Sequence, residues 1–237
     1  MPLPIRPRHP PFRLALFFGL ALSLPQGTRD ARGFGWLAKE PPAKQSTDSK
    51  IDPKSLPLKE GDIVFHRSQS RQSEAIRIAT RSRFNHTAIL IQHKGQLAVL
   101  EAVQPVKITS FAEFARRGNN HFVIKRLRDH DALLTPQVLE KMRKRGQDYI
   151  GKDYDLYFRW NDERIYCSEL VWKLYKEIVG IEVGQLQKAS DLHLDNPVVQ
   201  RLIKNRYGQM AAIPVNESII SPQAIYESAR LVTVYEQ

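Results

Sequence analysis

The apolar positions of the chain change period several times after residue 58, and each change marks an expected element. Apolar and β-branched residues crowd 84–92 and 97–103, and the Lys-Gly-Gln segment at 94–96 between them has the composition of a turn. Two such runs joined by glycine predict an antiparallel hairpin. Shorter apolar runs predict further strands at 63–65, 106–108, 122–127 and 231–235.

Elsewhere the apolar positions recur at helical spacing. Three of these stretches open with a capping residue followed by proline, at 135–136, 196–197 and 221–222. The capping side chain accepts an unpaired backbone N–H, and proline suits the first helical turn. Shorter helices are expected at 73–81 and 110–116. Helices mixed with antiparallel strands predict one α+β domain over residues 59–237.

A further helical stripe begins at the only cysteine of the sequence. Behind Cys167, apolar residues stand at offsets of 3, 4, 7 and 11, namely Leu170, Val171, Leu174 and Ile178. This spacing predicts an amphipathic helix to about residue 179, with Cys167 in its first turn and facing the core. Unpaired N–H groups and the helix dipole stabilise a thiolate there. Lone cysteines are also commonly small buried hydrophobes, so position alone leaves both interpretations open.

Two residues of the expected hairpin would complete a nucleophilic site. Acyl transfer at a thiol needs a base, a group that orients the base, and donors for the oxyanion. His86 opens the first strand and Glu101 lies near the end of the second, and an antiparallel hairpin brings such positions together. Glu101 is the stronger signal, because a carboxylate within an apolar strand is costly unless it meets water or a cation. The backbone N–H of Cys167 is the expected first oxyanion donor.

The first 58 residues differ from the rest. Arg6, Arg8 and Arg13 precede an apolar run at 14–24, and Pro-Gln-Gly follows at 25–27. These features predict a secretory signal peptide or an uncleaved N-terminal anchor over residues 1–27. Residues 28–58 carry four prolines among polar side chains, which is typical of a linker. We therefore expect an exported protein, periplasmic or associated with the cell envelope.

Charge narrows the expected partners. The net charge is +11, and basic residues gather at 67–83, 116–128 and 141–145. We interpret each cluster as a solvated surface, suited to an anionic cell-envelope surface, and no motif for specific nucleic-acid recognition accompanies them. The histidines other than His86 lack metal-ligand spacing, and neither HExxH nor CxxC occurs. We expect no metal and no cofactor.

Five short motifs follow one another along the chain. They are Gly-Asp-Ile-Val at 61–64, Asn-His-Thr-Ala-Ile at 85–89, Leu-Glu-Ala at 100–102, Gly-Lys-Asp-Tyr-Asp at 151–155 and Tyr-Cys-Ser-Glu-Leu-Val at 166–171. In this order they resemble the circularly permuted NlpC/P60 papain-like superfamily, and within it the YiiX/YebB-like cysteine hydrolases. Ordinary NlpC/P60 domains place the cysteine first, whereas here His86 precedes Cys167 by 81 residues. The resemblance implies a permuted papain-like fold with an antiparallel sheet packed against the cysteine helix.

The resemblance also implies roles for residues. Cys167 would be the nucleophile, His86 the general base and Glu101 the residue that orients it. The family's G-x-x-Y tyrosine corresponds to Tyr154, whose hydroxyl, with Tyr166 nearby, is expected at the oxyanion or substrate site.

The expected substrate is an amide or ester, and its class stays open. Wall-peptide enzymes of the superfamily usually carry Asp-Cys-Ser-Gly where this chain has Tyr166-Cys167-Ser168-Glu169. Permuted members are also similar to lecithin:retinol acyltransferase-type enzymes. A peptide, including peptidoglycan stem peptide, and a lipid acyl group are both possible substrates, for either a hydrolase or an acyltransferase.

A binding module is the alternative to an enzyme. The same cleft could hold a lipid or amphiphile without turning it over, against an aromatic wall. That wall would consist of Tyr149, Tyr154, Tyr157, Phe158 and Trp160. A binder has no need of an activated thiol, so thiol reactivity separates the two hypotheses.

Overall fold

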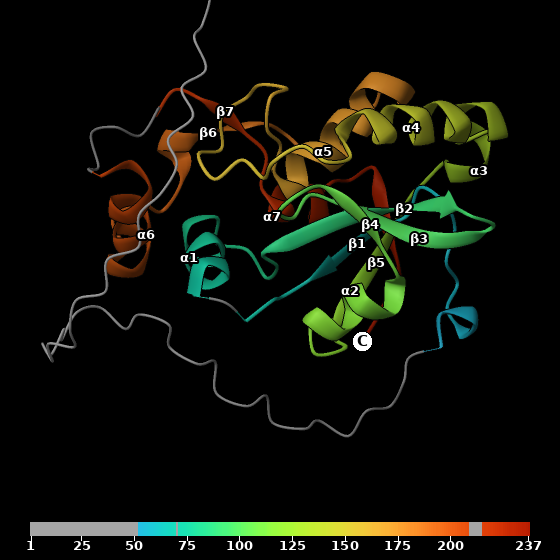
Figure 1. Ribbon diagram of the computed structural model, residues 1–237, viewed down its shortest axis with the longest axis horizontal. Helices are drawn as coiled ribbons and strands as arrows, with labels where there is room; N and C mark the ends of the chain where they lie inside the picture. Colours follow the sequence, from blue (N-terminus) through green and yellow to red (C-terminus); the bar gives the residue numbers. More distant parts are fainter. Residues whose placement is uncertain (1–51, 70, 209–214) are drawn as a thin grey trace, which may run out of the picture. The chain divides into compact units, whose positions relative to one another are not determined.

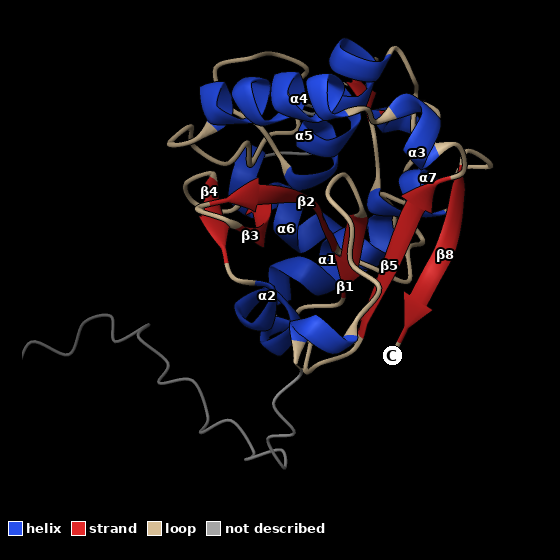
Figure 2. Ribbon diagram, turned by 90° about the vertical axis from the view of Figure 1, so that its right-hand side faces the viewer, coloured by secondary structure: helices blue, strands red, loops and turns tan. Residues whose placement is uncertain are grey.

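The alternating apolar runs form one antiparallel sheet in the strand order β4-β3-β2-β1-β5-β8 (Figures 1 and 2). The computed structural model describes residues 52–69, 71–208 and 215–237, all within one compact unit of the chain. The strands of the sheet are β1 (Ile63–His66), β2 (His86–His93), β3 (Gln96–Glu101), β4 (Lys107–Thr109), β5 (Phe122–Leu127) and β8 (Leu231–Glu236). The predicted hairpin of two apolar runs is β2–β3.

Helices cover both faces of this sheet (Figures 1 and 2). α4 and α5 lie over one face, with α5 packed on β2, and α2 lies against β3 on the other. α1 and α6 pack against each other. The α-helices are α1 (Arg71–Ala79), α2 (Phe111–Arg117), α3 (His130–Leu133), α4 (Pro136–Tyr149), α5 (Cys167–Leu174), α6 (Pro197–Tyr207) and α7 (Pro222–Tyr226).

Both sheet faces are buried because alternate side chains of each strand enter different cores. Ile63 and Phe65 of β1 belong to the core that also contains residues of α4 and α5, whereas Val64 between them packs on the opposite face. Phe111 and Phe114 of α2 close that second core. The period of two along the strands therefore fixes which side chains face α5.

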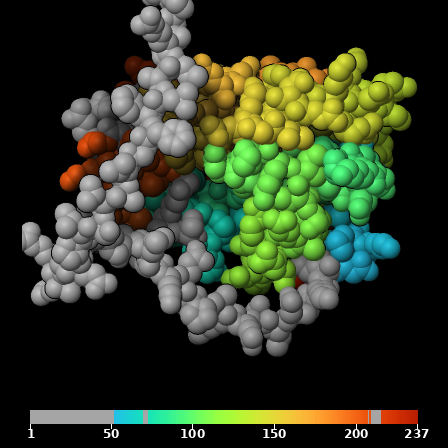
Figure 3. All heavy atoms as spheres, viewed as in Figure 1, coloured from blue at the N-terminus to red at the C-terminus, as the bar shows by residue number. Residues whose placement is uncertain are grey.

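α4 lies close to the sheet at a glycine. A Cβ added to Gly146 would come within 2.7 Å of Cδ2 of Leu100 on β3. In the space-filling view the yellow atoms of α4 meet the green atoms of the sheet region directly below them (Figure 3). The absence of a side chain at Gly146 thus lets α4 approach β3.

The cysteine helix has the predicted extent but not a uniform geometry. α5 is regular from Cys167 to Leu174, and the chain continues as the π-helical turn η2 (Tyr175–Val179). Gly180 then ends it with a φ of 77°, in the left-handed region that glycine tolerates.

Some secondary-structure elements differ from the predicted ones or are not predicted by the sequence. β3 ends at Glu101 rather than at residue 103, because the chain turns after Glu101 and returns as β4, whose first residue Lys107 pairs with Glu101. α3, the 3-10 turn η1 (Pro53–Ser55), and the two-stranded sheet of β6 (Gln187–Lys188) and β7 (Ser218–Ile219) have no clear signature in the sequence, whereas the 3-10 turn η3 (Ala189–Asp191) contains Ser190 and Asp191, which are typical of a capped turn. All are too short to show a hydrophobic period.

The N-terminal predictions lie largely outside the described residues. The expected signal peptide or anchor at 1–27 and most of the expected linker at 28–58 fall in this part. Within the described residues, none of the helices combines the length and hydrophobicity that a membrane span requires.

Candidate active site

Cys167 is the first residue of α5, and its side chain is nearly buried, with 4% of the residue exposed. Its sulfur meets three groups. The His86 imidazole and the backbone N–H of Thr87 both act on it to lower the pKa of the thiol, and the Tyr154 hydroxyl lies 4.0 Å from Sγ. All three can stabilise a negative charge on the sulfur.

The residues on either side of Cys167 attach the start of α5 to the segment after β7. The backbone N–H of Ile220 donates to the Tyr166 hydroxyl at 3.1 Å, and Ser168 Oγ donates to the Ile220 carbonyl at 2.7 Å. Glu169 Oε2 accepts the backbone N–H of Tyr166 at 3.4 Å, as the third residue of a capping box does. The Tyr166 hydroxyl is therefore occupied by a backbone N–H group, and Tyr154 is the tyrosine whose hydroxyl lies beside the sulfur.

His86 and Glu101 meet as the hairpin argument predicts, although not directly across the strands. Their side chains are joined by a 2.7 Å hydrogen bond between Nε2 and Oε2. Ile89 pairs with Leu100, and continuing that register places Glu101 opposite Ala88, two residues from His86 on the same side of β2. This is the diagonal neighbour position of an antiparallel pair. Since Nε2 faces Glu101, Nδ1 is left for the sulfur.

Glu101 is fully buried and binds two groups besides His86. Thr109 Oγ1 donates to Oε1 at 2.7 Å, and Arg117 Nη2 makes a short hydrogen bond to the same oxygen. No pattern in the sequence singles out Arg117 or Thr109 as part of the site. The interpretation of the basic cluster at 116–128 as solvated surface is wrong for Arg117 and also for Arg126, which pairs with the buried Asp62 at 2.7 Å.

These contacts raise the pKa of the imidazole and lower that of the thiol. Burial opposes a charge on either group, but the hydrogen bonds with Cys167 and Glu101 and their charges raise the pKa of His86 to about 9. Burial likewise opposes the thiolate, yet the hydrogen bond and charge of His86, with the N–H of Thr87, lower the pKa of Cys167. Burial works against Glu101 too, and His86 and Arg117 outweigh it, which lowers its pKa to about 2. All three shifts act in the direction of a thiolate–imidazolium pair beside a carboxylate.

Tyr154 stays protonated in this setting. Burial and the neighbouring charge of Cys167 raise the pKa of its hydroxyl well above the ordinary value. A neutral phenol next to the sulfur is a hydrogen-bond donor for an oxyanion that forms there.

A second histidine packs beside the first. His66 is 1% exposed, its ring lies 5.0 Å from that of His86 and 4.5 Å from that of Phe114, and neither of its nitrogens has a hydrogen-bond partner. Burial, followed by the charges of His86 and Arg117, lowers its pKa well below the ordinary value. His66 is therefore a neutral ring that shields one side of His86.

Two hollows meet at Tyr154. One, which we call the α1–α6 cavity, has about 870 Å³ of empty space including its open mouth, and Cys167 lies in its wall. The other, the His86 hollow, has about 930 Å³ counted in the same way and is lined by His86, Arg117 and Gln104 among others. The sulfur and the imidazole thus open onto different spaces.

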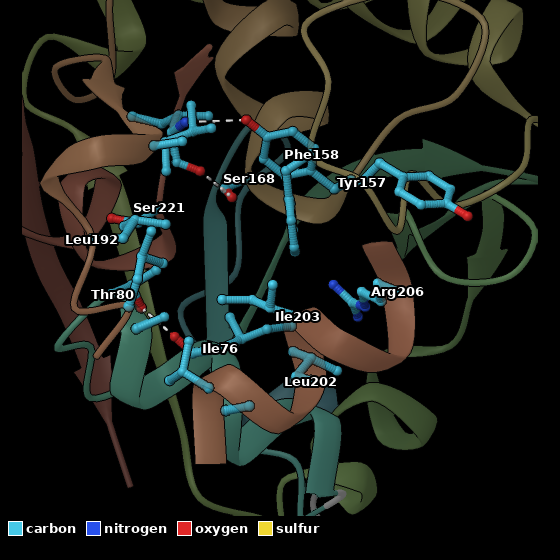
Figure 4. Close-up of a pocket in the computed structure, with 18 of the residues that line it drawn as sticks. Ile76, Thr80, Tyr157, Phe158, Ser168, Leu192, Leu202, Ile203, Arg206 and Ser221 are labelled. Carbon is cyan, nitrogen blue, oxygen red and sulfur yellow. Dashed lines mark hydrogen bonds between the residues drawn. The ribbon is translucent and has the colours of Figure 1, made fainter. Parts of the chain in front are cut away.

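The expected aromatic wall exists only in part. Tyr154, Tyr157 and Phe158 line the α1–α6 cavity. Figure 4 shows Phe158 facing Ile203 of α6 across open space. Tyr149 is buried in the main core, and Trp160 packs on Trp172 with ring centroids 5.3 Å apart.

The geometry can be compared with known proteins. The family model described as "permuted papain-like amidase enzyme, YaeF/YiiX, C92 family" matches residues 57–235. This chain belongs to that family. It is 38% identical over 178 residues to the uncharacterized protein YiiX of Escherichia coli strain K12, covering 75% of this chain and 86% of the relative.

A solved structure gives the same result for the fold. The crystal structure of "metalloprotein yiiX" from Escherichia coli O157:H7 aligns with a TM-score of 0.70 at 39% identity, covering 76% of this chain and 97% of the other. The predicted permuted papain-like fold and the YiiX-like branch are confirmed.

Because that relative is described as a metalloprotein, we asked whether the side chains of this chain could bind a metal ion. In the described ranges, no group of three or more His, Cys, Asp or Glu side chains is placed to bind a metal ion. Near Cys167, His86 and Glu101 bind each other, and Glu101 also binds Arg117. The described residues do not fit a resident metal, and we derive no step through one.

Proposed function

We propose that this protein is a cysteine hydrolase or acyltransferase that cleaves an amide or ester through an acyl-thioester at Cys167. The observation that carries the proposal is the continuous chain of contacts from Cys167 through His86 to Glu101, with the thiol at a helix N-terminus. Membership of a papain-like amidase family supports a cysteine hydrolase-like role.

The first half-reaction follows from the protonation states. The thiolate of Cys167 attacks the carbonyl carbon, a C–S bond forms, and negative charge develops on the oxygen. The backbone N–H of Cys167 and the Tyr154 hydroxyl are the donors proposed for that oxyanion. The C–N or C–O bond then breaks, and His86 gives its proton to the departing amine or alcohol.

The second half-reaction restores the site. His86, now neutral, takes a proton from water or from an acceptor alcohol or amine that attacks the thioester. The C–S bond breaks, the acyl product leaves, and Cys167 returns to the thiolate. Glu101 stays ionised throughout and keeps Nε2 of His86 protonated, so Nδ1 performs both transfers.

The test of this proposal is trapping of the intermediate. Incubation with an activated ester followed by intact-mass measurement should add one acyl group, and digestion should locate it on Cys167. Cys167→Ala should show neither the adduct nor turnover while unfolding at the same urea concentration. Unchanged turnover in that variant would end the proposal.

A non-catalytic binding module is the second candidate. The wall of the α1–α6 cavity favours it, because an apolar space beside the sulfur suits an amphiphile whether or not chemistry follows. A binder would show an ordinary thiol titration and would retain its ligand when Cys167 is replaced by Ala.

We also propose that the protein acts outside the cytoplasm, in the periplasm or at an anionic envelope surface. The three arginines before the apolar run at 14–24 support this. Fractionation of cells expressing the full chain and a Leu16→Arg, Leu20→Arg variant tests it. Equal distribution of the two proteins would contradict export.

A further inference from the structure

We propose that the His86 hollow binds the leaving group of the substrate and, through Arg117 and His66, selects one that carries an anionic oxygen group, a carboxylate or a phosphate. This inference rests on the proposed function and deepens it, because it names the chemistry of the group that is released when Cys167 is acylated.

The leaving group departs on the side of the His86 hollow. His86 lines this hollow, whereas Cys167 lies in the wall of the α1–α6 cavity. When the C–N or C–O bond breaks, its electron pair goes to the leaving nitrogen or oxygen, which takes the proton of His86. The atom that receives this proton must lie beside the imidazole, so the rest of the leaving group extends into the hollow.

The charged side chains that line the hollow are positive. Arg117 lines it with 28% of its side chain exposed, and His86 carries a proton when the thiolate attacks. Glu101, the carboxylate bound to both, has no exposed side-chain surface, and none of the described residues in the wall is Asp or Glu. A group bound here contacts cations and no carboxylate, which favours an anion over a neutral or cationic group.

Two side chains of the wall have nitrogens without a partner. Nε of Arg117 and both ring nitrogens of His66 are buried and make no hydrogen bond to any part of the chain that the structure describes. A buried donor without a partner is costly, and an acceptor supplied by a ligand removes that cost. Burial lowers the pKa of His66, so its neutral ring has one N–H to donate. An anionic oxygen accepts from both kinds of donor.

Two other polar side chains of the wall are held within the protein. Asn85 Oδ1 accepts the backbone N–H of Ser68 at 2.9 Å, and Asn85 Nδ2 donates to the Ser68 carbonyl at 2.9 Å. Gln104 Nε2 donates to Asp153 Oδ1 at 2.6 Å, and Gln104 Oε1 accepts the backbone N–H of Tyr154 at 2.7 Å. Discrimination by charge therefore falls to the side chains with unpaired nitrogens.

The test is a leaving-group series with one acyl group. Butanoyl esters of 4-hydroxybenzoate, 4-hydroxyphenylphosphonate and 4-hydroxybenzamide release a carboxylate, a phosphonate and a neutral amide. Each kcat/KM of the wild type is divided by the rate constant of the same ester with 2-mercaptoethanol, which removes differences in intrinsic reactivity. At least one anionic ester should be favoured over the neutral ester by about tenfold. The better anion distinguishes a carboxylate from a phosphate as the natural group.

Replacement of Arg117 connects this preference to the hollow. Arg117→Met should bring the anionic-to-neutral ratio close to one, and any loss of thiol activation cancels because both esters react with the same thiol. Arg116→Met removes the same charge from an exposed neighbouring residue and should keep the wild-type ratio. This control is needed because the net charge of +11 attracts anions to the whole protein.

Replacement of His66 gives a second, independent variant. His66→Phe keeps an aromatic ring beside His86 but removes both nitrogens, and it should lower the anionic-to-neutral ratio by about threefold or more. It also keeps the proposal testable if Arg117→Met folds poorly. His121→Phe is the matched control, because His121 is exposed and is not among the residues lining the hollow.

The outcomes separate the two proposals. A ratio that falls in either variant but in neither control supports the anion site. Equal normalised kcat/KM for all three esters, a preference for the neutral ester, or a ratio that Arg117→Met and His66→Phe change no more than their controls overturns the anion site but leaves the thiol hydrolase in place. Failure of every ester to acylate Cys167 overturns the hydrolase and the anion site together.

Discussion

Glu101 shows at the scale of single residues why the site needs more than three members. A carboxylate with no exposed surface pays a large desolvation cost, and here His86, Thr109 and Arg117 all contribute hydrogen bonds that offset it. The low pKa of Glu101 and the high pKa of His86 depend on this set of contacts. Arg117 therefore acts on the thiol through two intermediate residues.

Replacement of Arg117 should reveal that dependence. Arg117→Met leaves Oε1 of the buried Glu101 without the guanidinium that donates to it and should lower the free energy of unfolding by about 3 kcal/mol, whereas Arg117→Lys should cost less because the charge remains. Urea titration measures the difference. Arg116→Met, one residue away and exposed, is the control. Equal midpoints for Arg117→Met and Arg116→Met would show that the pair contributes nothing to stability.

Substitution of Tyr154 and of Tyr166 should have different effects, one on activity and the other on stability. Tyr154→Phe removes a donor 4.0 Å from Sγ and should lower kcat about a hundredfold with little change in stability. Tyr166→Phe leaves the buried N–H of Ile220 unpaired and should cost about 1–3 kcal/mol of stability with kcat nearly unchanged. Steady-state kinetics and urea unfolding of both variants measure this. The reverse pattern would make Tyr166 the oxyanion donor.

The sequence is sufficient to nominate some residues of this site but not others. Cys167, His86 and Glu101 stand out because each breaks or begins a local hydrophobic pattern. Arg117 ends a short helix in a basic run, and its partner lies 16 residues back on another element. A contact of that kind depends on how α2 packs on β3, which no local pattern encodes.

At the scale of elements, the start of α5 is fixed from both sides of the cysteine. Side chains at 166 and 168 hydrogen-bond to Ile220, and α5 packs on β2 near His86. The thiol therefore has little freedom relative to the imidazole, which is the preorganisation that nucleophilic catalysis requires.

The approach of α4 to the sheet should be sensitive to volume at one position. Gly146→Val places branched carbons where even a Cβ would lie 2.7 Å from Leu100 and should cost about 1–3 kcal/mol by overpacking. Lys144→Val, exposed on the same helix, measures the effect of a valine on the helix away from the core. Valine has a higher helix propensity than glycine, so a loss at position 146 comes from packing. Thermal unfolding of both variants checks this. A loss no larger for Gly146→Val than for Lys144→Val would mean that α4 is not closely packed there.

Periodicity predicts the long elements well for a physical reason. Strands buried on both faces and helices with one apolar stripe must repeat their apolar positions, as β2, β3, α4 and α5 do. The π-helical end of the cysteine helix and the small β6–β7 sheet are decided by tertiary contacts of a few residues. Their geometry leaves no period to detect.

At the scale of the whole molecule, the site makes stability depend on pH. Glu101 has a folded pKa of about 2 against an ordinary value of 4.5, so its contribution is present above pH 4.5 and is lost as pH falls through 2. Its size is on the order of 3 kcal/mol. His86, whose folded pKa of about 9 exceeds the ordinary 6.5, contributes below pH 6.5 and loses that contribution as pH rises through 9.

Acid unfolding should expose the contribution of Glu101. Between pH 4.5 and 2.5 the urea midpoint of the wild type should fall more steeply than that of Glu101→Gln, which has no carboxylate to protonate. Burial lowers the pKa of His66 and the charge of Glu101 opposes that shift, so the comparison reports the loss of the Glu101 charge together with its effect on His66. Parallel curves would show that Glu101 is not held ionised by its neighbours.

The most direct test of the whole account is the pH dependence of alkylation of Cys167 by iodoacetamide. The chain has a single cysteine, so every adduct reports on this thiol. The wild-type thiol should react at pH values well below the unperturbed cysteine pKa of about 8.5. In His86→Ala and Glu101→Ala the reactivity at low pH should be mostly lost. Identical, ordinary thiol titrations for all three proteins would contradict the activated cysteine and favour a binding module instead.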